Sequence, residues 1–562
     1  MRLRFNYQIF LATLLIGILV FFRFWQLGKI PLALYWDELA IGIDAYSISE
    51  TGRDIYGNNW LQAIYPSYGD YKAPVTIWLT SIPVRLFGLN EFSVRLPSAV
   101  MGIIGIIGIW ILVKEFIHYT GTDNAKENKY LLTSGIFFIL TLPWYYHFSR
   151  ISFESFISLC LLIWILVFCI RGLKAHGIWL LMAGLIAGLT QYCYFSSRLI
   201  TPLFTISLFL IFFRTSFSKK WWILSTIIIY IILIIPFYRS PYVVASQQLR
   251  YSADNILTDE KLQQVSASLI YQSNNILLTR IYYHRYWFLI RSFLNNYFSH
   301  FTFNYLFLEG DINLRHHTGW GGELLIVALP IILLGFYWLF NNFKNPAVKL
   351  ILLWLAYAPL TASIPYEAPH ASRSIYLIIP LIMVFIFGMK QLFTLVNKIP
   401  SMVIKFNNLK LTLIPIKFSL ILVIILLTAN FSLYLEDYFN HYSVRSYQVW
   451  QLGNKYLANA FLKYQNQYQQ FIFTNSFRLP LLSILFYNQE KIKTIQDQNS
   501  NRVFSFNWIN EFKNLKVEEA PEKELQPGHL YLTVPNQVIS QYLKESYVYP
   551  DGSDAVWVIA RD

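Results

Sequence analysis

The sequence predicts a polytopic membrane protein that is built almost entirely from α-helices and carries a small α/β domain at its C-terminal end. Of the 562 residues, 55% are hydrophobic and only 14% are charged, whereas a soluble protein carries about 25% charged residues. Apolar runs close to the roughly 20 residues needed to cross a bilayer recur throughout residues 1–435. This composition excludes a disordered, collagenous or ordinary soluble chain.

About eleven of these apolar runs are long enough to span the membrane. The first, residues 9–25, follows Arg2 and Arg4 and resembles a signal peptide. Bulky aromatic residues stand where a cleavage site would need small ones, so we expect a retained helix. The other runs lie at approximately 96–113, 131–148, 154–170, 177–194, 199–213, 221–237, 322–340, 348–364, 375–393 and 415–435.

The net charge of +14 follows from this topology. When the N-terminus is placed in the cytoplasm and the sides are alternated, Lys and Arg gather in the inner loops, as the positive-inside rule requires. The short outer loops hold little basic charge beyond Arg150, Arg198 and Arg373. An odd number of spans places the C-terminus outside. We therefore expect a multi-pass protein of the cell membrane with a cytoplasmic N-terminus and an extracytoplasmic C-terminus.

The segment that follows the last span is predicted to be a domain of its own, so we divide the chain into residues 1–435 and 436–562. Acids and bases nearly balance in the second part. The hydrophobic pattern predicts helices at 443–464 and 538–547, and strands at 470–474, 530–534 and 555–560. We expect a small extracytoplasmic α/β domain.

The first long outer loop is the most informative part of the chain. Asp37 and Glu38 follow the first span by about ten residues and open an amphipathic stretch, 39–48, that suits a helix lying in the membrane interface. Residues 75–87 suit a second such helix. A carboxylate beside a membrane is costly unless it is solvated or paired, so the two acids are functional candidates. In the alternative interpretation they only cap the surface helix and favour its dipole.

Further acids and bases are predicted on the same outer face. Asp70 and Lys72 lie in the first loop, Arg95 stands at the start of the second span, and Glu154 lies next to Arg150 in the following outer loop. Carboxylates can bind a metal or accept a proton and cations can bind phosphate, so this set suits a phosphorylated substrate. Lys72 and Arg95 could instead only extend to lipid headgroups.

Several short motifs resemble those of the GT-C membrane glycosyltransferases, in the branch of the protein O-mannosyltransferases and lipid A aminoarabinose transferases. They are the acidic pair Asp37–Glu38, the Lys-x-Pro element at 72–74, VRLPSA at 94–99, GDINLRHHTGWGGELL at 310–325 and PHASR at 369–373. The resemblance covers about residues 1–395 and implies a GT-C fold with interfacial helices in the first outer loop. The aminoarabinose transferases have Glu-Lys-Pro-Pro at the second motif, where this chain has Tyr71-Lys72-Ala73-Pro74 and its nearest acid, Asp70, is displaced by one position.

This resemblance implies transfer of a hexosyl or pentosyl group from a polyprenyl-phosphate-linked donor, at the outer face of a prokaryotic membrane, with inversion at the sugar carbon. The acceptor would be a protein hydroxyl, a lipid or a glycan. Asp37 would be the general base, Glu38 would position it or contact the sugar, and Glu154 would assist. The expected substrate-binding residues are Asp70, Lys72, Arg95, Arg150, Arg315, His370 and Arg373.

A divalent cation is the one cofactor that we consider, with Asp37, Glu154 and His316 as its expected ligands. His316 and His317 are adjacent, and adjacent side chains do not share a helix face, so we expect only one of them to join an acid. His370 and Arg373 have one-turn spacing; the alternative interpretation is an ordinary helix start after Pro369.

Three other classes of function make different predictions. A transporter or flippase would have charged or broken helices at mid-membrane and inverted halves, whereas these spans are nearly free of charge. A non-catalytic assembly protein would depend on its C-terminal domain and not on the acids of the first loop. A nucleic-acid-binding protein would gather its basic residues in one stripe, whereas these are spread over separate loops.

Overall fold

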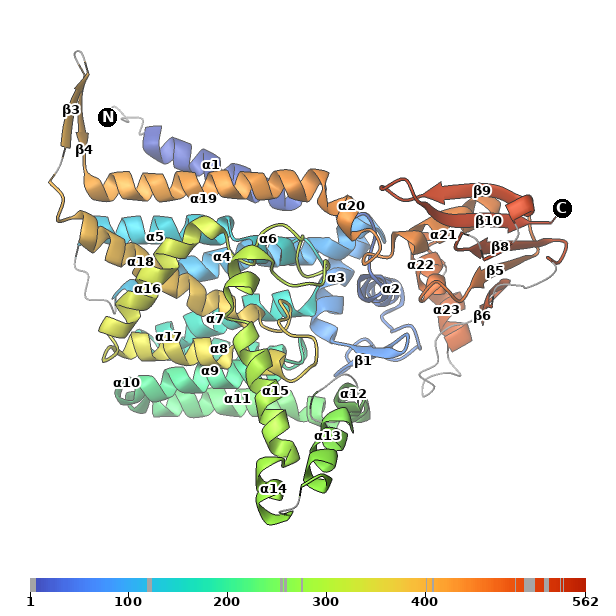
Figure 1. Ribbon diagram of the computed structural model, residues 1–562, viewed down its shortest axis with the longest axis horizontal. Helices are drawn as coiled ribbons and strands as arrows, with labels where there is room; N and C mark the ends of the chain where they lie inside the picture. The colour runs from blue at the N-terminus through green and yellow to red at the C-terminus, as the bar shows by residue number, and fades with distance from the viewer. Residues whose placement is uncertain are drawn as a thin grey trace.

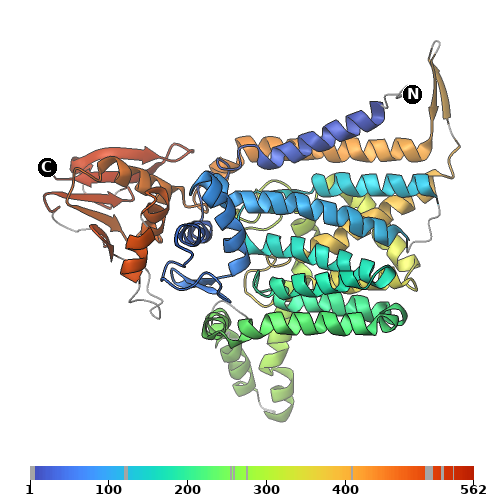
Figure 2. The same ribbon diagram turned by 180° about the vertical axis from the view of Figure 1, so that it is seen from behind.

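A long bundle of helices is joined end to end with a small mixed α/β domain in the computed structural model (Figure 1). The structure describes residues 7–118, 124–252, 256, 260–273, 276–400, 402–406, 409–490, 492–499, 511–519, 525–535, 537–538 and 540–561. Arg2 and Arg4, which precede the first predicted span, lie outside the described residues. The N-terminus lies toward one end of the molecule and the C-terminus toward the other in both views (Figures 1 and 2).

Every predicted span falls on a helix of the bundle. These helices are α1 (Tyr7–Phe24), α4 (Glu91–His118), α5 (Ala125–Leu140), α7 (Glu154–Lys174), α8 (Ile178–Thr190), α9 (Ser197–Ile211), α11 (Lys220–Arg239), α16 (Leu329–Asn341), α17 (Pro346–Tyr357), α18 (Ile378–Val396) and α19 (Pro415–Asn440). Within the described residues, six helices are long and apolar enough to cross a membrane by length and composition, and further apolar helices are shorter. The prediction of a polytopic helical membrane protein is confirmed.

One predicted span is divided in two. The run 131–148 forms α5, which ends at Leu140, and a separate short helix, α6 (Pro143–Phe148). Pro143 occupies the first position of α6, and Leu142 before it is extended, with φ −79° and ψ 113°. A proline disfavours the helical conformation in the residue before it, so the chain leaves one helix and starts another at this point.

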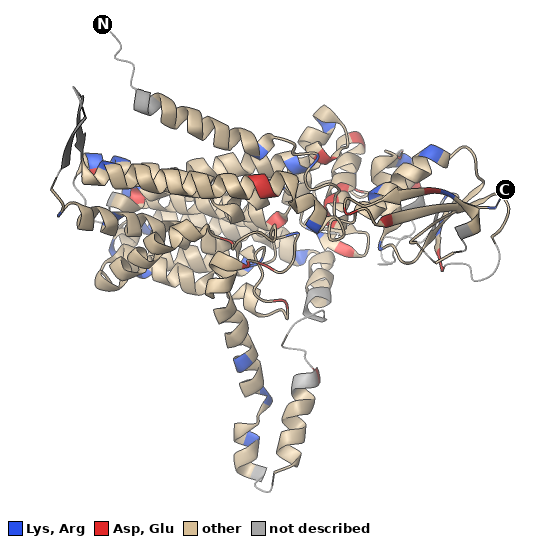
Figure 3. Ribbon diagram, turned by 45° about the horizontal axis from the view of Figure 1, so that its top comes forward, with Lys and Arg blue, Asp and Glu red and all other residues tan. Residues whose placement is uncertain are grey.

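The closest helix packing in the bundle depends on glycine. Gly335 of α16 and Gly388 of α18 face the partner helix so closely that a Cβ at Gly335 would meet the backbone of Val384, and one at Gly388 would meet the backbone of Ile331. Small residues of this kind let membrane helices approach each other. Figure 3 marks few charged residues along the middle of the bundle, and several acidic residues where it meets the C-terminal domain.

The C-terminal domain contains a six-stranded sheet with the order β6-β7-β5-β8-β10-β9. Its strands are β5 (Gln470–Thr474), β6 (Glu511–Phe512), β7 (Leu515–Glu518), β8 (His529–Thr533), β9 (Leu543–Val548) and β10 (Asp554–Ala560), and its helices are α20 (Tyr442–Ser446), α21 (Leu452–Tyr464), α22 (Pro480–Tyr487) and α23 (Ile492–Asn499). β5 is parallel to both of its neighbours, β7 and β8, whereas β10 pairs antiparallel with β8 and β9. The predicted small α/β domain is confirmed.

Two local predictions in this domain need correction. The predicted helix 538–547 is wrong, because Leu543–Val548 is the edge strand β9, whose pairing with β10 outweighs its local helical pattern. The predicted helix 443–464 is two helices, α20 and α21, separated near Gln451, whose φ of 56° lies in the left-handed region. This break brings Gln448 and Gln451 to the wall of the cavity described below.

Helix α2 (Trp36–Thr51) joins the two parts of the molecule. It lies between the bundle and the C-terminal domain (Figure 1) and buries Glu38 to Ala45 without interruption. Its core residues, including Leu39 and Ile43, share one hydrophobic cluster with α21, α22 and the sheet. A Cβ at Gly42 would come within 2.7 Å of the Phe486 ring, so glycine permits this close contact. The start of the first outer loop is therefore fixed by the C-terminal domain.

Candidate functional site

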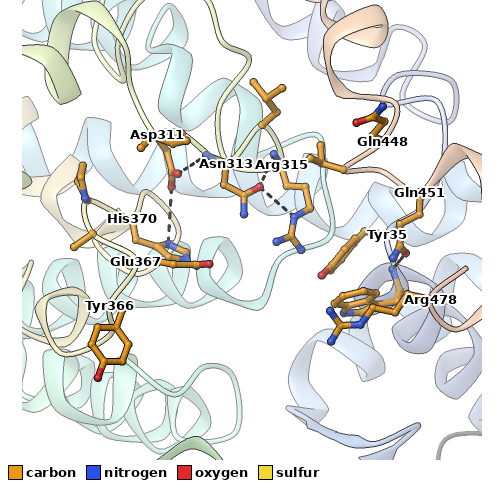
Figure 4. A pocket seen from close by; sticks show the side chains of 16 residues that line it. Tyr35, Asp311, Asn313, Arg315, Tyr366, Glu367, His370, Gln448, Gln451 and Arg478 are labelled. Carbon is orange, nitrogen blue, oxygen red and sulfur yellow. Dashed lines mark hydrogen bonds and ion pairs between the residues drawn. The ribbon is translucent and has the colours of Figure 1, made fainter. Parts of the chain in front are cut away.

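A cavity of about 720 Å³ lies where the bundle meets the C-terminal domain (Figure 4). We call it the junction cavity. Its wall is formed by the start of α2, by two loops of the membrane part and by two segments of the C-terminal domain. The lining residues used below are Tyr35, Trp36, Asp311, Asn313, Arg315, Glu367, His370, Gln451 and Arg478.

Two arginines rest on two neighbouring aromatic rings of this wall. The guanidinium carbon of Arg315 lies 3.8 Å from the centroid of the Tyr35 ring, and that of Arg478 lies 4.0 Å from the Trp36 ring. The backbone N–H of Trp36 donates to Oε1 of Gln451 at 3.1 Å, and this hydrogen bond connects α2 to the C-terminal domain. Cation–π contacts of this kind orient the guanidinium groups, so the wall presents fixed positive charge from both parts of the protein.

Asp37, which follows Trp36 in the sequence, contacts a buried lysine. The Lys72 ammonium donates hydrogen bonds to Asp37 and, at 2.7 Å, to Oδ2 of Asp70. The Lys72 side chain is 7% exposed, whereas those of Asp37 and Asp70 are 34% and 40% exposed. Burial lowers the pKa of Lys72, but the carboxylates of Asp37 and Asp70 raise it by more, so its pKa lies above the ordinary value. The arrangement is a permanently charged cation between two carboxylates that solvent can reach.

Local structure explains how Lys72 is held. It ends the short strand β2 (Asp70–Lys72), which pairs antiparallel with β1 (Tyr65–Ser67), and it precedes α3 (Pro74–Phe87). The N–H of Ala73, between the strand and the helix, donates to Oε1 of Glu154 at 2.8 Å. Glu154 begins α7, so its carboxylate ties a second outer segment to the Lys72 strand. The structure thus brings together Asp37, Asp70, Lys72 and Glu154, as the sequence predicted.

The structure does not bring Glu38, Arg95 or Arg150 to the cavity. Glu38 and Arg95 are fully buried and form an ion pair, with Nη2 of Arg95 3.1 Å from Oε2 of Glu38. Arg95 also donates to the carbonyl oxygens of Pro31 and Ala33 at 2.8 and 2.7 Å. These groups fix the chain before α2 against α4.

Arg150 likewise fixes one segment of the bundle against others, here at the end of α1. Its Nη1 donates to the carbonyl oxygens of Phe22 and Arg23 at 2.7 and 3.0 Å, and its Nε donates to the Tyr438 hydroxyl at 3.2 Å. The buried guanidinium therefore joins α1, α6 and α19. Arg150 and Arg95, two of the predicted substrate-binding residues, are thus both buried among protein acceptors.

A cluster of an acid and two histidines lies in and beside the cavity wall. Oδ2 of Asp311 lies 3.1 Å from Nδ1 of His316 and 4.0 Å from Nδ1 of His370. The two imidazole rings have centroids 4.4 Å apart, and one candidate ligand atom from each residue lies within 4.8 Å of the others. All three residues are buried. Of the three predicted metal ligands, only His316 belongs to this cluster. Asp37 lies beside Lys72, and Glu154 accepts a hydrogen bond from Ala73.

The pKa shifts of Asp311 and His370 are in the directions that favour metal binding. Burial raises the pKa of Asp311, but His316, His370 and the N–H of Ala371 lower it by more, so the net shift is downward. Burial and the neighbouring His316 hold the pKa of His370 well below its usual value. An ionised carboxylate and a neutral imidazole are the forms that ligate Zn²⁺ and similar cations.

Of the remaining predicted residues, Arg315 and His370 line the junction cavity, and Arg373 lies beside it, where its N–H donates to Nδ1 of His370 at 3.4 Å. Sequence reasoning missed Asp311, although it stands in the quoted motif at 310–325, because nothing local connects it to His370. It also missed Arg478 and Gln451, for which the sequence of the C-terminal domain carries no signal.

Comparisons with known proteins agree with this architecture. Residues 71–238 match the family described as dolichyl-phosphate-mannose-protein mannosyltransferase. The crystal structure of ArnT from Cupriavidus metallidurans in the apo state aligns with 99% of this chain and 98% of its own, with a TM-score of 0.52 and 12% identity. The chain has the GT-C fold. At this identity the likeness to ArnT is one of fold, and it confirms the GT-C fold that the motif resemblance implied.

Two further proteins are similar to this chain. ArnT from the same organism bound to undecaprenyl phosphate aligns with 97% of both chains, at 12% identity and a TM-score of 0.49. A curated relative, an uncharacterized protein of Aquifex aeolicus (strain VF5), is 30% identical over 121 residues. That alignment spans 21% of this chain and 23% of the relative, so the chain matches about a quarter of the relative's length.

Proposed function

We propose that this GT-C protein is a glycosyltransferase that moves a sugar from a polyprenyl-phosphate-linked donor to an acceptor hydroxyl at the outer face of the membrane. The observation that carries the proposal is the buried Lys72 ammonium held between Asp37 and Asp70. Asp37 directly follows Trp36, which lines the junction cavity. The family match at residues 71–238 supports it, because that segment contains both Lys72 and Glu154.

Asp37 is the general base of the proposed reaction. A hydroxyl attacks a sugar carbon efficiently only as its proton is removed, and the base must come within about 3 Å of it. The Asp37 carboxylate is 34% exposed, so an acceptor can reach it, and Lys72 fixes its position. The hydroxyl oxygen forms a bond to the sugar carbon while the bond from that carbon to the phosphate oxygen breaks. A single displacement of this kind inverts the sugar carbon.

Lys72 and the cavity arginines stabilise the leaving group. The departing polyprenyl phosphate gains negative charge as its bond to the sugar breaks, and fixed cations in a site of low dielectric favour that change. Lys72 remains charged because two carboxylates raise its pKa. Arg315, fixed on Tyr35, presents a second cation from the cavity wall. Glu154 acts on the reaction through Ala73 and the Lys72 strand and is therefore a positioning residue.

A divalent cation at Asp311, His316 and His370 is part of this proposal. The carboxylate and the two imidazoles supply an O and two N ligands, which suits Zn²⁺ in a site with an open position. Asp311 and His370 line the junction cavity together with Arg315. A cation there would add positive charge to the wall that faces a phosphate.

The predicted sidedness of the protein supports the same assignment. The charge distribution of the sequence predicts a cytoplasmic N-terminus, and the C-terminal domain lies toward the other end of the bundle in the structure (Figure 2). The junction cavity would then open at the outer surface, where lipid-linked sugars and extracytoplasmic acceptors meet. The sugar is a hexose or a pentose, and the acceptor is a protein, a lipid or a glycan.

A lipid extract tests the proposal. Cells that lack this protein should accumulate one polyprenyl-phosphate-linked sugar, identified by mass spectrometry, and the wild-type gene should reverse the accumulation. The Asp37→Asn gene should not reverse it although its product is present in the membrane at the wild-type level. An unchanged pool of lipid-linked sugars, or full reversal by the variant, would contradict the proposal.

A further inference from the structure

An arm of three helices projects sideways from the bundle. It comprises α13 (Glu260–Tyr271), α14 (Ile276–Tyr282) and α15 (Arg285–Ser299). The arm crosses the direction of the spanning helices and leaves the bundle on the side of α11 (Figures 1 and 3). Nothing in the proposed reaction uses this arm.

The base of the arm is fixed at one end of the bundle. Nδ2 of Asn296 donates to the carbonyl oxygens of Ser363 and Pro365 at 3.2 and 2.9 Å, and the Tyr297 hydroxyl donates to the carbonyl oxygen of Ala356 at 2.9 Å. These acceptors follow α17 or form its last turn. That end of the bundle also carries the junction cavity, since Tyr366 to His370 line it. The arm therefore lies near the end that we assign to the outer face.

Much of the exposed surface of the arm is apolar. Helix α15 has no buried residue, and Tyr286, Ile290, Leu294 and Phe298, which are spaced four apart and so share one face, are 43–59% exposed. Other exposed apolar side chains of the arm are Val265, Tyr271, Leu277, Leu278, Ile281, Tyr282, Tyr283 and Trp287. Many exposed apolar side chains gathered on one element mark an interaction site.

The charge of the arm and the helices around it indicate that its partner is a lipid surface. Residues 260–299 contain three arginines, one lysine and a single acid, Glu260. Arg280, Arg285 and Arg291 accompany the Tyr and Trp side chains that favour the interface between headgroups and acyl chains. The adjoining helix α11 buries only Thr226 and Phe237, so the flank from which the arm emerges faces lipid.

We propose that α13–α15 is an interfacial arm that lies in the plane of the membrane at the outer leaflet and binds anionic phospholipids. Because the arm crosses the spanning helices near their outer end, its apolar side chains would lie at the boundary between headgroups and acyl chains. Its arginines would contact lipid phosphates. The proposal does not depend on sugar transfer, since it rests on side chains outside the junction cavity.

A fluorescent probe tests the position of the arm. Leu294→Cys and Leu543→Cys are matched variants, because the two leucines are 43% and 39% exposed and Leu543 lies on the edge strand β9 of the C-terminal domain. Each is labelled with an environment-sensitive dye in nanodiscs of phosphatidylcholine and phosphatidylglycerol; the native Cys160, Cys169 and Cys193 are buried. Spin-labelled lipid should quench the label at residue 294 but not the label at residue 543. Aqueous iodide should quench the label at residue 543. Equal iodide quenching at both positions would overturn the proposal. It would also be overturned if the label at residue 294 were shielded from iodide only after a soluble protein is added.

The preference for anionic lipid is tested separately. Exchanging Arg285 and Arg291 for Gln should reduce the retention of phosphatidylglycerol over phosphatidylcholine by about five-fold for each arginine, as measured by mass spectrometry of the lipids that remain bound. The matched control exchanges Lys493 and Lys544, exposed residues of the C-terminal domain, for Gln and should leave retention unchanged. Equal retention by the arm variant and the control would overturn the lipid assignment.

Discussion

Nη2 of Arg95 lies 3.1 Å from Oε2 of Glu38, and the two side chains are only 0% and 1% exposed. Asp37, the neighbour of Glu38 in sequence, turns instead toward Lys72 and remains 34% exposed. Successive residues of a helix point about 100° apart, so one acid of the pair can enter the core while the other stays partly exposed beside Lys72. The acidic pair thus combines an anchor, Glu38, with a candidate base, Asp37.

Breaking this anchor should destabilise the protein strongly. Glu38→Gln leaves the Arg95 guanidinium buried without its counter-charge, a change that typically costs about 3–5 kcal/mol. We expect a clear fall in the midpoint of thermal unfolding in detergent. Glu50→Gln is the control, because Glu50 pairs with Arg85 at 3.9 Å on the surface, where such pairs contribute about 0–1 kcal/mol. Equal midpoints for the two variants would show that the buried pair does not anchor α2.

Stability should depend on pH through Asp44. This residue of α2 is fully buried, and its Oδ2 accepts a hydrogen bond from Ser67 at 2.7 Å. Burial raises the pKa of Asp44 well above its ordinary value. The folded protein therefore holds a proton that the unfolded chain releases near pH 4, so the contribution of Asp44 to stability falls as pH rises from about 4 through the folded pKa.

Asp44→Asn should remove this dependence. Relative to the wild type, the variant should gain more thermal stability at pH 8 than at pH 5, because the amide carries no proton to lose. Unfolding midpoints of both proteins at the two pH values give the comparison. A difference between variant and wild type that is the same at both pH values would contradict a raised pKa at Asp44.

Much of this arrangement could be predicted from the sequence, because its causes are local. Apolar runs predict the spans, and the alternation of the spans predicts Asp37, Lys72 and Glu154 on one face of the membrane. The junction cavity could not be predicted in this way. Trp36 and Arg478 meet only through the docking of the C-terminal domain on α2, and strand β9 exists only because β10 pairs with it.

Metal binding should depend on Asp311 and His316. If a cation occupies the cluster, the purified protein should contain about one equivalent of a divalent transition metal, since the cluster offers a single site. His316→Ala and Asp311→Asn should each lose it. His441→Ala is the control, because His441 lies on the surface with its side chain 60% exposed. Elemental analysis by mass spectrometry is the measurement, and an unchanged metal content in the cluster variants would exclude this site.

Donor affinity should depend on Lys72. Lys72→Met removes a charged hydrogen-bond donor worth about 1.5–3 kcal/mol, so we expect binding of the polyprenyl-phosphate sugar to weaken about 10- to 100-fold. Lys72→Arg should recover part of the affinity. Arg85→Gln, a change at a side chain that is 63% exposed on α3, should bind as the wild type does. Titration of the donor into the protein in nanodiscs measures these affinities. Wild-type donor affinity in Lys72→Met would show that Lys72 does not bind the donor phosphate.

The central claim is that Asp37 is the base, and its most direct test is sugar transfer by Asp37→Asn compared with Asp70→Asn. Both variants remove one carboxylate from Lys72, so a general disturbance of Lys72 affects them alike. We predict that Asp37→Asn lowers the turnover number about 10²- to 10⁴-fold with donor binding retained, and that Asp70→Asn loses far less. Turnover by Asp37→Asn within about two-fold of the wild type would contradict general-base catalysis by Asp37, as would an equal loss in both variants.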